Sequence, residues 1–273
     1  MSIINKTHYN LSSRQAEFFS AAPFPHIILD DFLDPEYFEK VTAELSNDES
    51  ASIGGREFNS EVERGKWISL NSTLPLLVNE IIDEMNAEKW VSNLRQLTGI
   101  ESLLPTKVGN TELANYHEMK PGGVLGPHVD HAVDPNTGKP HVLNNLIYLS
   151  KNWCPSFGGA TEFFDKSGSK KVGKVEYKQN RSIIFLHTPY SFHGVEQISS
   201  QSTTTRKSIY VDYYCTNYHP YAHMKLPFKN HWFYHPTTFS LDSIFDYLIP
   251  RNLNYSKAAI SYRLNKMKAD LSG

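Results

Sequence analysis

Short apolar runs separated by turn-rich clusters dominate the chain from about residue 105 to residue 217, and they constrain its fold more than any other feature. Each run has the length of a β-strand, and the residues between runs are mainly Gly, Pro, Asn, Asp and Ser. The runs are ELANYHEM, HVLNNLIYL, KVGKVEY, RSIIFLHT and RKSIYVDYYC, and the clusters between them include PGG, DPNTGKP, SFGG and SSQSTTT. Several short strands at close spacing predict a barrel or a sandwich of sheets.

The first hundred residues are predicted to be helical, with one strand at residues 25–33. Residues 74–90 and 88–98 carry helical patterns, and Gly99 stands where a helix would end. The polar, aperiodic stretch Ser46 to Lys66 is predicted to be a long mobile loop.

The sequence indicates one domain over residues 1–273, because it contains no linker and no repeat. The core is expected at about 23–217, with supporting helices in its N-terminal part. Residues 218–273 would form a helical C-terminal extension that acts as a lid or packing element. The apolar stripe of the last helix is expected to pack on the domain. A homo-oligomer that forms through this helix is the alternative.

Composition excludes several functional classes. The chain has 273 residues and 40% hydrophobic content, and its net charge of −2 provides no electrostatic footprint for nucleic acid or an anionic membrane. Two cysteines, Cys154 and Cys215, are too few for a disulfide framework. No signal sequence and no membrane-spanning run of about 20 apolar residues is evident. We therefore expect a cytoplasmic protein that acts on a small molecule or a peptide.

A candidate metal site begins with His128 and Asp130, two residues apart on an extended segment. About one His-x-acid pair is expected by chance in this composition, so the tripeptide alone does not distinguish a site from a solvated loop. A second histidine from a distant strand would complete a facial triad of two imidazoles and one carboxylate. His193, which follows the run RSIIFLHT and a proline turn, is the candidate, with His187 in reserve.

Two further strands place polar side chains beside that site. Period-two alternation puts Asn144, Leu146 and Tyr148 on one face of the strand at 142–150, where they could line a pocket. Arg206 opens the last strand of the core, and a cation there needs a carboxylate partner. It could hold the far carboxylate of a dicarboxylic co-substrate.

These residues resemble a known family. The order His128-x-Asp130, His193, Arg206 is similar to the motif of the Fe(II)- and 2-oxoglutarate-dependent oxygenases, and in particular to their prolyl-4-hydroxylase-like branch. Supporting segments are PFPHIILDDFLDPE, NYHEMKPGGVLGPHVD, LIYLSKNW, FGGATEFFD and SFHGV. The likeness covers roughly residues 23–217, and residues 218–273 match nothing that we can name.

The resemblance implies an α+β fold with a double-stranded β-helix (jelly-roll or cupin-like) core. It implies a hydroxylase that uses Fe(II), 2-oxoglutarate and O2, with ascorbate as a candidate auxiliary reductant. The reaction would release succinate and CO2 and hydroxylate an unactivated C–H bond, and a carboxylate at Asp130 favours hydroxylation over halogenation. The primary substrate would be a small molecule, a free amino acid or a prolyl or peptidyl group.

The resemblance also implies roles for single residues. His128, Asp130 and His193 would bind Fe(II). Arg206 would pair with the distal carboxylate of 2-oxoglutarate, and Tyr148 would donate its hydroxyl to the same carboxylate. Tyr116 would flank the co-substrate. Leu146 and Asn144 would line the pocket. Arg206 stands thirteen residues after His193, which is a few more than in members of this branch. Lys207 is therefore the reserve candidate for the same role. Its side chain is expected to point to the opposite face of the strand.

Two other functions remain compatible with the metal motif. One is a cupin-like binding module whose metal is structural or absent. The other is a zinc-dependent hydrolase, because zinc also accepts two imidazoles and a carboxylate. Neither has a general need for a cation and a phenol behind the metal, so Arg206 and Tyr148 favour the oxygenase.

Overall fold

The computed structural model describes residues 2–47, 54–59, 63–69, 74–106, 114–130, 134, 137, 139–166, 168–188 and 190–216. Its helices are α1 (Gln15–Ser20), α2 (Pro35–Asn47), α3 (Leu76–Asn86) and α4 (Glu88–Thr98), with 3₁₀ turns at Lys6–His8, Leu11–Arg14 and Pro155–Phe157. Its strands are β1 (His26–Leu29), β2 (Gly55–Phe58), β3 (Glu63–Ser69), β4 (Leu103–Leu104), β5 (Ala114–His128), β6 (His141–Tyr148), β7 (Thr161–Phe164), β8 (Lys171–Val175), β9 (Ser182–Leu186), β10 (His193–Val195) and β11 (Arg206–Cys215).

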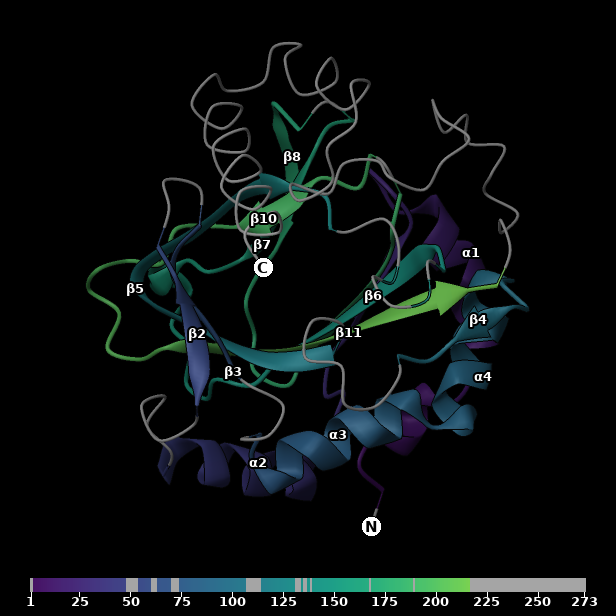
Figure 1. The fold of residues 1–273 in the computed structure, drawn as a ribbon, viewed down its shortest axis with the longest axis horizontal. Helices are drawn as coiled ribbons and strands as arrows, with labels where there is room; N and C mark the ends of the chain where they lie inside the picture. The colour runs from purple at the N-terminus through teal and green to yellow at the C-terminus, as the bar shows by residue number, and fades with distance from the viewer. Residues whose placement is uncertain are drawn as a thin grey trace, which may run out of the picture.

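All strand pairs are antiparallel, and the main path runs β1-β9-β6-β11-β5-β10-β7-β8. The path curls into a half-barrel in which β7, β8 and β10 lie across from β6 and β11 (Figure 1). This mostly antiparallel half-barrel agrees with the double-stranded β-helix core that the resemblance implies.

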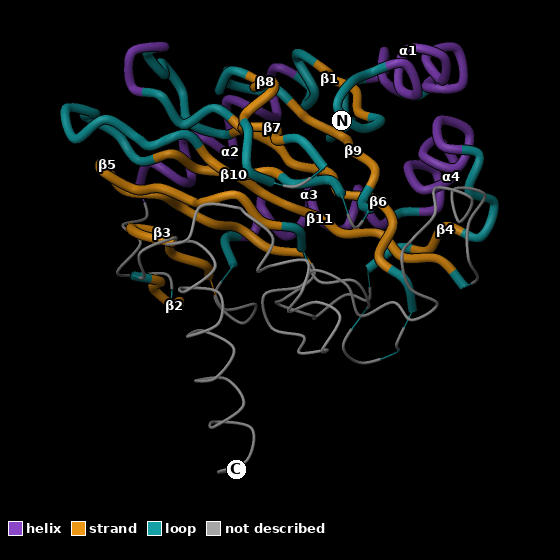
Figure 2. Tube along the Cα trace, turned by 90° about the horizontal axis from the view of Figure 1, so that it is seen from above, coloured by secondary structure: helices purple, strands orange, loops and turns teal. Residues whose placement is uncertain are grey.

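The helices cover the outer face of the sheet, and the largest core lies between them. Helices α2 and α3 run side by side beneath β11 and β6 in Figure 1, and Figure 2 shows the same layering from above. Side chains from α3, α4 and one face of β6 and β11 share this core, among them Ile81, Trp90, Ile147 and Val211. Alternation along β6 and β11 leaves their other face for the interior of the half-barrel.

Strand β5 joins the two halves of the barrel. Its first residues pair with β11, and its last residues pair with β10. The PGG cluster, which we expected to be a turn between strands, instead lies within β5 as an irregularity in its pairing with β3. Gly122 has a φ of +80° and a Cβ on Gly123 would lie 2.8 Å from the Lys120 carbonyl oxygen, so both positions favour glycine.

The prediction of a long mobile loop from Ser46 to Lys66 is wrong for its described part. Residues 55–58 and 63–69 form the antiparallel strands β2 and β3, and β3 pairs with β5 at the edge of the barrel. The strand was hidden because the first part of β3, with Glu63, Arg64 and Lys66, has the polar composition of a loop.

Several expectations concern residues outside the described ones, including the C-terminal extension at 218–273. Within the described residues, no helix is long and apolar enough to cross a membrane.

Candidate active site

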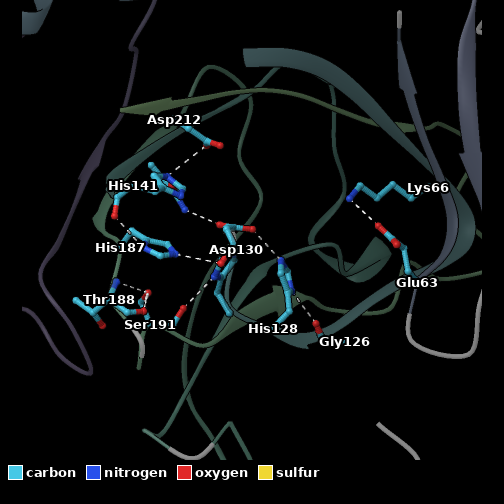
Figure 3. Close-up of polar contacts among 12 residues, drawn as sticks. Glu63, Lys66, Gly126, His128, Asp130, His141, His187, Thr188, Ser191 and Asp212 are labelled. Carbon is cyan, nitrogen blue, oxygen red and sulfur yellow. Dashed lines mark hydrogen bonds and ion pairs between the residues drawn. The ribbon is translucent and has the colours of Figure 1, made fainter. Parts of the chain in front are cut away.

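Three predicted ligands meet at the mouth of the half-barrel. His128 ends β5 and His193 begins β10, and the two residues are direct partners in the antiparallel register. Asp130 follows β5, with Oδ1 3.4 Å from Nε2 of His128 and Oδ2 3.4 Å from Nε2 of His193. One ligand atom from each residue fits within 4.8 Å of the others, so the three could hold one metal ion (Figure 3 labels His128 and Asp130).

Backbone hydrogen bonds set which nitrogen each imidazole offers. Nδ1 of His128 lies 2.9 Å from the Gly126 carbonyl oxygen, and Nδ1 of His193 lies 3.0 Å from that of Ser191. A carbonyl only accepts, so each Nδ1 carries the proton and donates. The lone pair of each Nε2 therefore faces the carboxylate, in the arrangement that a metal-binding histidine needs.

The protonation states suit a metal. Burial lowers the pKa of His193 to about 4, so its ring is neutral at pH 7. Burial raises the pKa of Asp130, but the neighbouring His193 and His128 side chains outweigh this effect and hold the pKa well below its usual range. Asn144 on β6 donates from Nδ2 to Asp130 Oδ2 at 2.7 Å and thereby orients the carboxylate.

His187 supports the cluster but is not part of it. Its ring nitrogens lie 3.3 Å from the backbone oxygen of Asp130 and 3.1 Å from that of His141. Burial lowers its pKa to about 3. The ring stacks on His141, which lies 3.7 Å from Asp212, and Figure 3 shows this group on one side of Asp130. His141 is 3% exposed.

Arg206 lies behind this site as a buried cation. Only 1% of the residue is exposed, and its guanidinium lies 5.0 Å from the ring centres of both Tyr148 and Tyr177. Nε donates to the Gly159 carbonyl oxygen and one Nη donates to Ser208 Oγ. Within the described part of the chain, no carboxylate forms an ion pair with Arg206. Such a cation is suited to an anionic ligand.

The other predicted pocket residues on β6 share the inner face with Arg206. Tyr148 stacks on Tyr177 at 4.3 Å and its hydroxyl is hydrogen-bonded to Thr161 Oγ1 at 2.5 Å. Leu146 packs against the same inner cluster. Lys207 points to the opposite face, as expected, and donates from Nζ to the Leu45 carbonyl oxygen.

Tyr116 is not beside Arg206, and the expectation that it flanks the co-substrate is wrong. It pairs with Ile209 and lies in the core under the helices, where its ring contacts Trp67 and its hydroxyl donates to Glu118. Along β10 one residue separates His193 from Val195, but two separate their partners His128 and Leu125 on β5. This bulge inverts the alternation, so Tyr116 and His128 face opposite sides.

Three inner residues were missed by the sequence analysis. His117 on β5 is 8% exposed and pairs with Ser208, two residues from Arg206 on β11. Glu63 and Lys66 on β3 form an ion pair at 2.7 Å that Figure 3 shows on the far side of His128 from His187. Counting by two along β11 from Arg206 identifies the residues of that strand that face the barrel interior. The same count along β5 fails because its pairing is irregular, so the inner position of His117 could not be predicted.

A family model confirms the resemblance over the site-bearing strands. Residues 112–214 match the 2OG-Fe(II) oxygenase superfamily, and this segment contains the metal motif and Arg206. No curated protein matches the chain by sequence.

Solved structures confirm the fold. A prolyl-4-hydroxylase from Pseudomonas putida is 17% identical with a TM-score of 0.54, over 76% of this chain and 99% of that one. A prolyl hydroxylase from Trichoplax adhaerens, in complex with a hypoxia inducible factor peptide fragment, is 16% identical with a TM-score of 0.51, over 77% and 91%. HygX from Streptomyces hygroscopicus, with nickel, 2-oxoglutarate and hygromycin B bound, is 11% identical with a TM-score of 0.51, over 81% and 96%.

Proposed function

We propose that this chain is a 2-oxoglutarate-dependent dioxygenase that uses Fe(II) and O2 and hydroxylates an unactivated C–H bond, because residues 112–214 match the 2OG-Fe(II) oxygenase superfamily. The substrate would be a small molecule, a free amino acid or a peptidyl group. The balanced reaction takes the substrate, 2-oxoglutarate and O2 to the hydroxylated product, succinate and CO2.

His128, Asp130 and His193 would hold the iron. The donor set of two imidazoles and one carboxylate fits Fe(II), and a facial triad of this kind leaves three coordination positions open. When bound, the iron supplies the oxidative chemistry with O2 and the keto acid. The protein's part is to fix the ligands, and the hydrogen bonds at Gly126, Ser191 and Asn144 do so before any ion binds.

Arg206 is the observation that carries the proposal. Its buried guanidinium would form a bidentate ion pair with the distal carboxylate of 2-oxoglutarate. Tyr148 lies against the guanidinium and would turn its hydroxyl from Thr161 to the same carboxylate. A zinc hydrolase or a cupin-like binding module gives no reason to bury this cation. Hydrophobic side chains around it, including Phe163 and Ile183, would exclude water.

An anaerobic absorption spectrum tests the proposal. Adding Fe(II) and then 2-oxoglutarate to the protein is expected to produce a metal-to-ligand charge-transfer band in the visible range. His193→Ala should abolish the band, whereas the matched control His8→Ala, which changes a histidine packed on Phe32, should retain it. Bound metal without a band in the wild-type protein would refute the proposal and favour the hydrolase or the binding module.

A further inference from the structure

Lys66 on β3 and His117 on β5 are further polar groups on the inner side of the barrel that carries Arg206. Lys66 pairs with Met119 in the sheet register, and Met119 in turn pairs with Arg206. Lys66 is therefore on the inner side of the barrel edge. Figure 3 shows the Lys66 side chain on the far side of His128 from His187. The ammonium group thus lies close to the candidate metal site.

His117 is the second component. Among the described residues, neither of its ring nitrogens has a hydrogen-bond partner, although the side chain is buried. A buried polar group without a partner costs about 1–3 kcal/mol, so its retention indicates that a ligand completes it. Tyr210 lies 5.3 Å from the ring and fixes its orientation. Burial, with Lys66 and Arg206 nearby, lowers the pKa of His117 well below its usual range, which leaves a neutral ring with one N–H to donate.

Glu63 provides the opposite charge. Its carboxylate accepts from Nζ of Lys66 at 2.7 Å, and Glu63 pairs with Leu125, three positions before His128 on β5, so it also lies near the candidate metal ligands. The side chains of Lys66 and Glu63 are 15% and 21% exposed, whereas Arg206 is almost fully buried. The pair is therefore reached from the mouth of the barrel, the side from which a primary substrate would enter.

We propose that Lys66, His117 and Glu63 form the recognition site for the primary substrate, and that this substrate is a free α-amino acid. Its carboxylate binds Lys66 and the His117 N–H, and its ammonium group binds Glu63. The zwitterion replaces one internal ion pair with two intermolecular ones and gives His117 its missing partner. The side chain of the amino acid then extends toward His128 and His193. This inference rests on the proposed function, because it assigns the substrate of the same site.

Anaerobic calorimetry on the protein loaded with Fe(II) and 2-oxoglutarate tests the proposal without turnover. The probes are the free L-amino acids, each compared with its primary amide and its N-acetyl derivative. At least one amino acid is expected to bind, and both derivatives should bind about 10-fold to 100-fold more weakly, since each loses a charge-assisted hydrogen bond. The same amino acid should stimulate succinate release in air.

Variants assign the discrimination to the named residues. Lys66→Met and His117→Leu should reduce the preference for the acid over the amide to less than about threefold, and Glu63→Gln should do so for the free amine over the N-acetyl form. Lys66→Arg should keep the preference. Lys174→Met removes an exposed lysine on β8 and should behave as wild type. Should Lys66→Met fail to fold, the double variant Glu63→Gln/Lys66→Met replaces it.

Three results would overturn the inference. One is a wild-type protein that forms the charge-transfer band but binds no free amino acid. Another is an acid preference that persists in both Lys66→Met and His117→Leu. The third is that Lys66→Met and His117→Leu change only the KM for 2-oxoglutarate, which would place both residues at the co-substrate. Absence of the band in the wild type would instead refute the proposed function, and this inference with it.

Discussion

Asn144 on β6 donates a hydrogen bond from Nδ2 to Oδ2 of Asp130 over 2.7 Å, so an amide from the centre of the sheet holds the only carboxylate of the candidate metal cluster. The next residue, Asn145, points to the opposite face and donates to Ser182 Oγ at 2.6 Å. Two adjacent amides on one strand thus have separable roles.

Asn144→Ala is expected to weaken metal binding about 10-fold to 100-fold, because Asp130 loses the group that orients it. Anaerobic titration with Fe(II) measures the effect. Asn145→Ala is the matched control: it should lower the melting temperature but keep the metal affinity. Equal metal affinity in the two variants would contradict the role of Asn144.

Arg206→Met is expected to raise the KM for 2-oxoglutarate by at least about 10-fold, since it removes the charge-assisted pair with the distal carboxylate. Without 2-oxoglutarate, its melting temperature should equal or exceed that of the wild type, because a buried guanidinium without a carboxylate partner is replaced by an apolar side chain. Steady-state succinate assays and thermal unfolding measure the two quantities. A large loss of stability would indicate a purely structural arginine.

Two tyrosines on opposite faces provide a matched comparison. Tyr148→Phe should raise the KM for 2-oxoglutarate several-fold, because its hydroxyl lies on the Arg206 side of the barrel. Tyr116→Phe should leave that KM unchanged, since its hydroxyl bonds Glu118 in the outer core. A shift with Tyr116→Phe alone would restore the role that the sequence analysis gave it.

Acid sensitivity is expected from Asp30, which follows β1. Hydrogen bonds from Arg181, and then from Lys178, lower the pKa of Asp30 to about 2 from an ordinary 3.8. A folded-state pKa below the unfolded value gives stability that is present above pH 4 and lost as the pH falls toward 2. Because Asp30 is partly exposed, Asp30→Asn should cost about 1 kcal/mol at pH 7 and little at pH 2. Denaturant unfolding at both pH values measures the difference.

Gly194 follows His193 on β10, where its Cα lies close to the backbone of β5. A Cβ at this position would lie 2.6 Å from the Leu125 carbonyl oxygen. Gly194→Ala is therefore expected to push β10 away from β5 and weaken metal binding by about 10-fold or more. Gly173→Ala on β8, where a Cβ meets no atom within 4 Å, is the control. Unchanged metal affinity in Gly194→Ala would show that the bulge tolerates the methyl group.

The clustering of the candidate metal ligands could be predicted because its sequence signal is local. His128 and Asp130 share an extended segment, and the strand–turn–strand pattern before His193 indicates its return. The strand β6 alternates regularly, so the inner position of Asn144 follows from counting by two.

The other positions in the candidate site could not be predicted because the strands that carry them are irregular. The bulge near Gly126 inverts the face of every earlier residue in β5, so counting back from His128 places Tyr116 inside and His117 outside, the reverse of the structure. The strand with Lys66 was hidden for a related reason: its polar residues face a site, and a loop has the same composition.

The pairing of His128 with His193 has a consequence for how the fold is held together. The chain between them includes β6, β7, β8 and β9, so the two histidines close a long segment at its ends. An ion bound to both would act as a cross-link between β5 and β10, as a disulfide does, and would restrict the unfolded chain as well as serve the reaction. Resistance to proteolysis would then rise with iron supply, and the lifetime of the protein would be coupled to the metal that it uses.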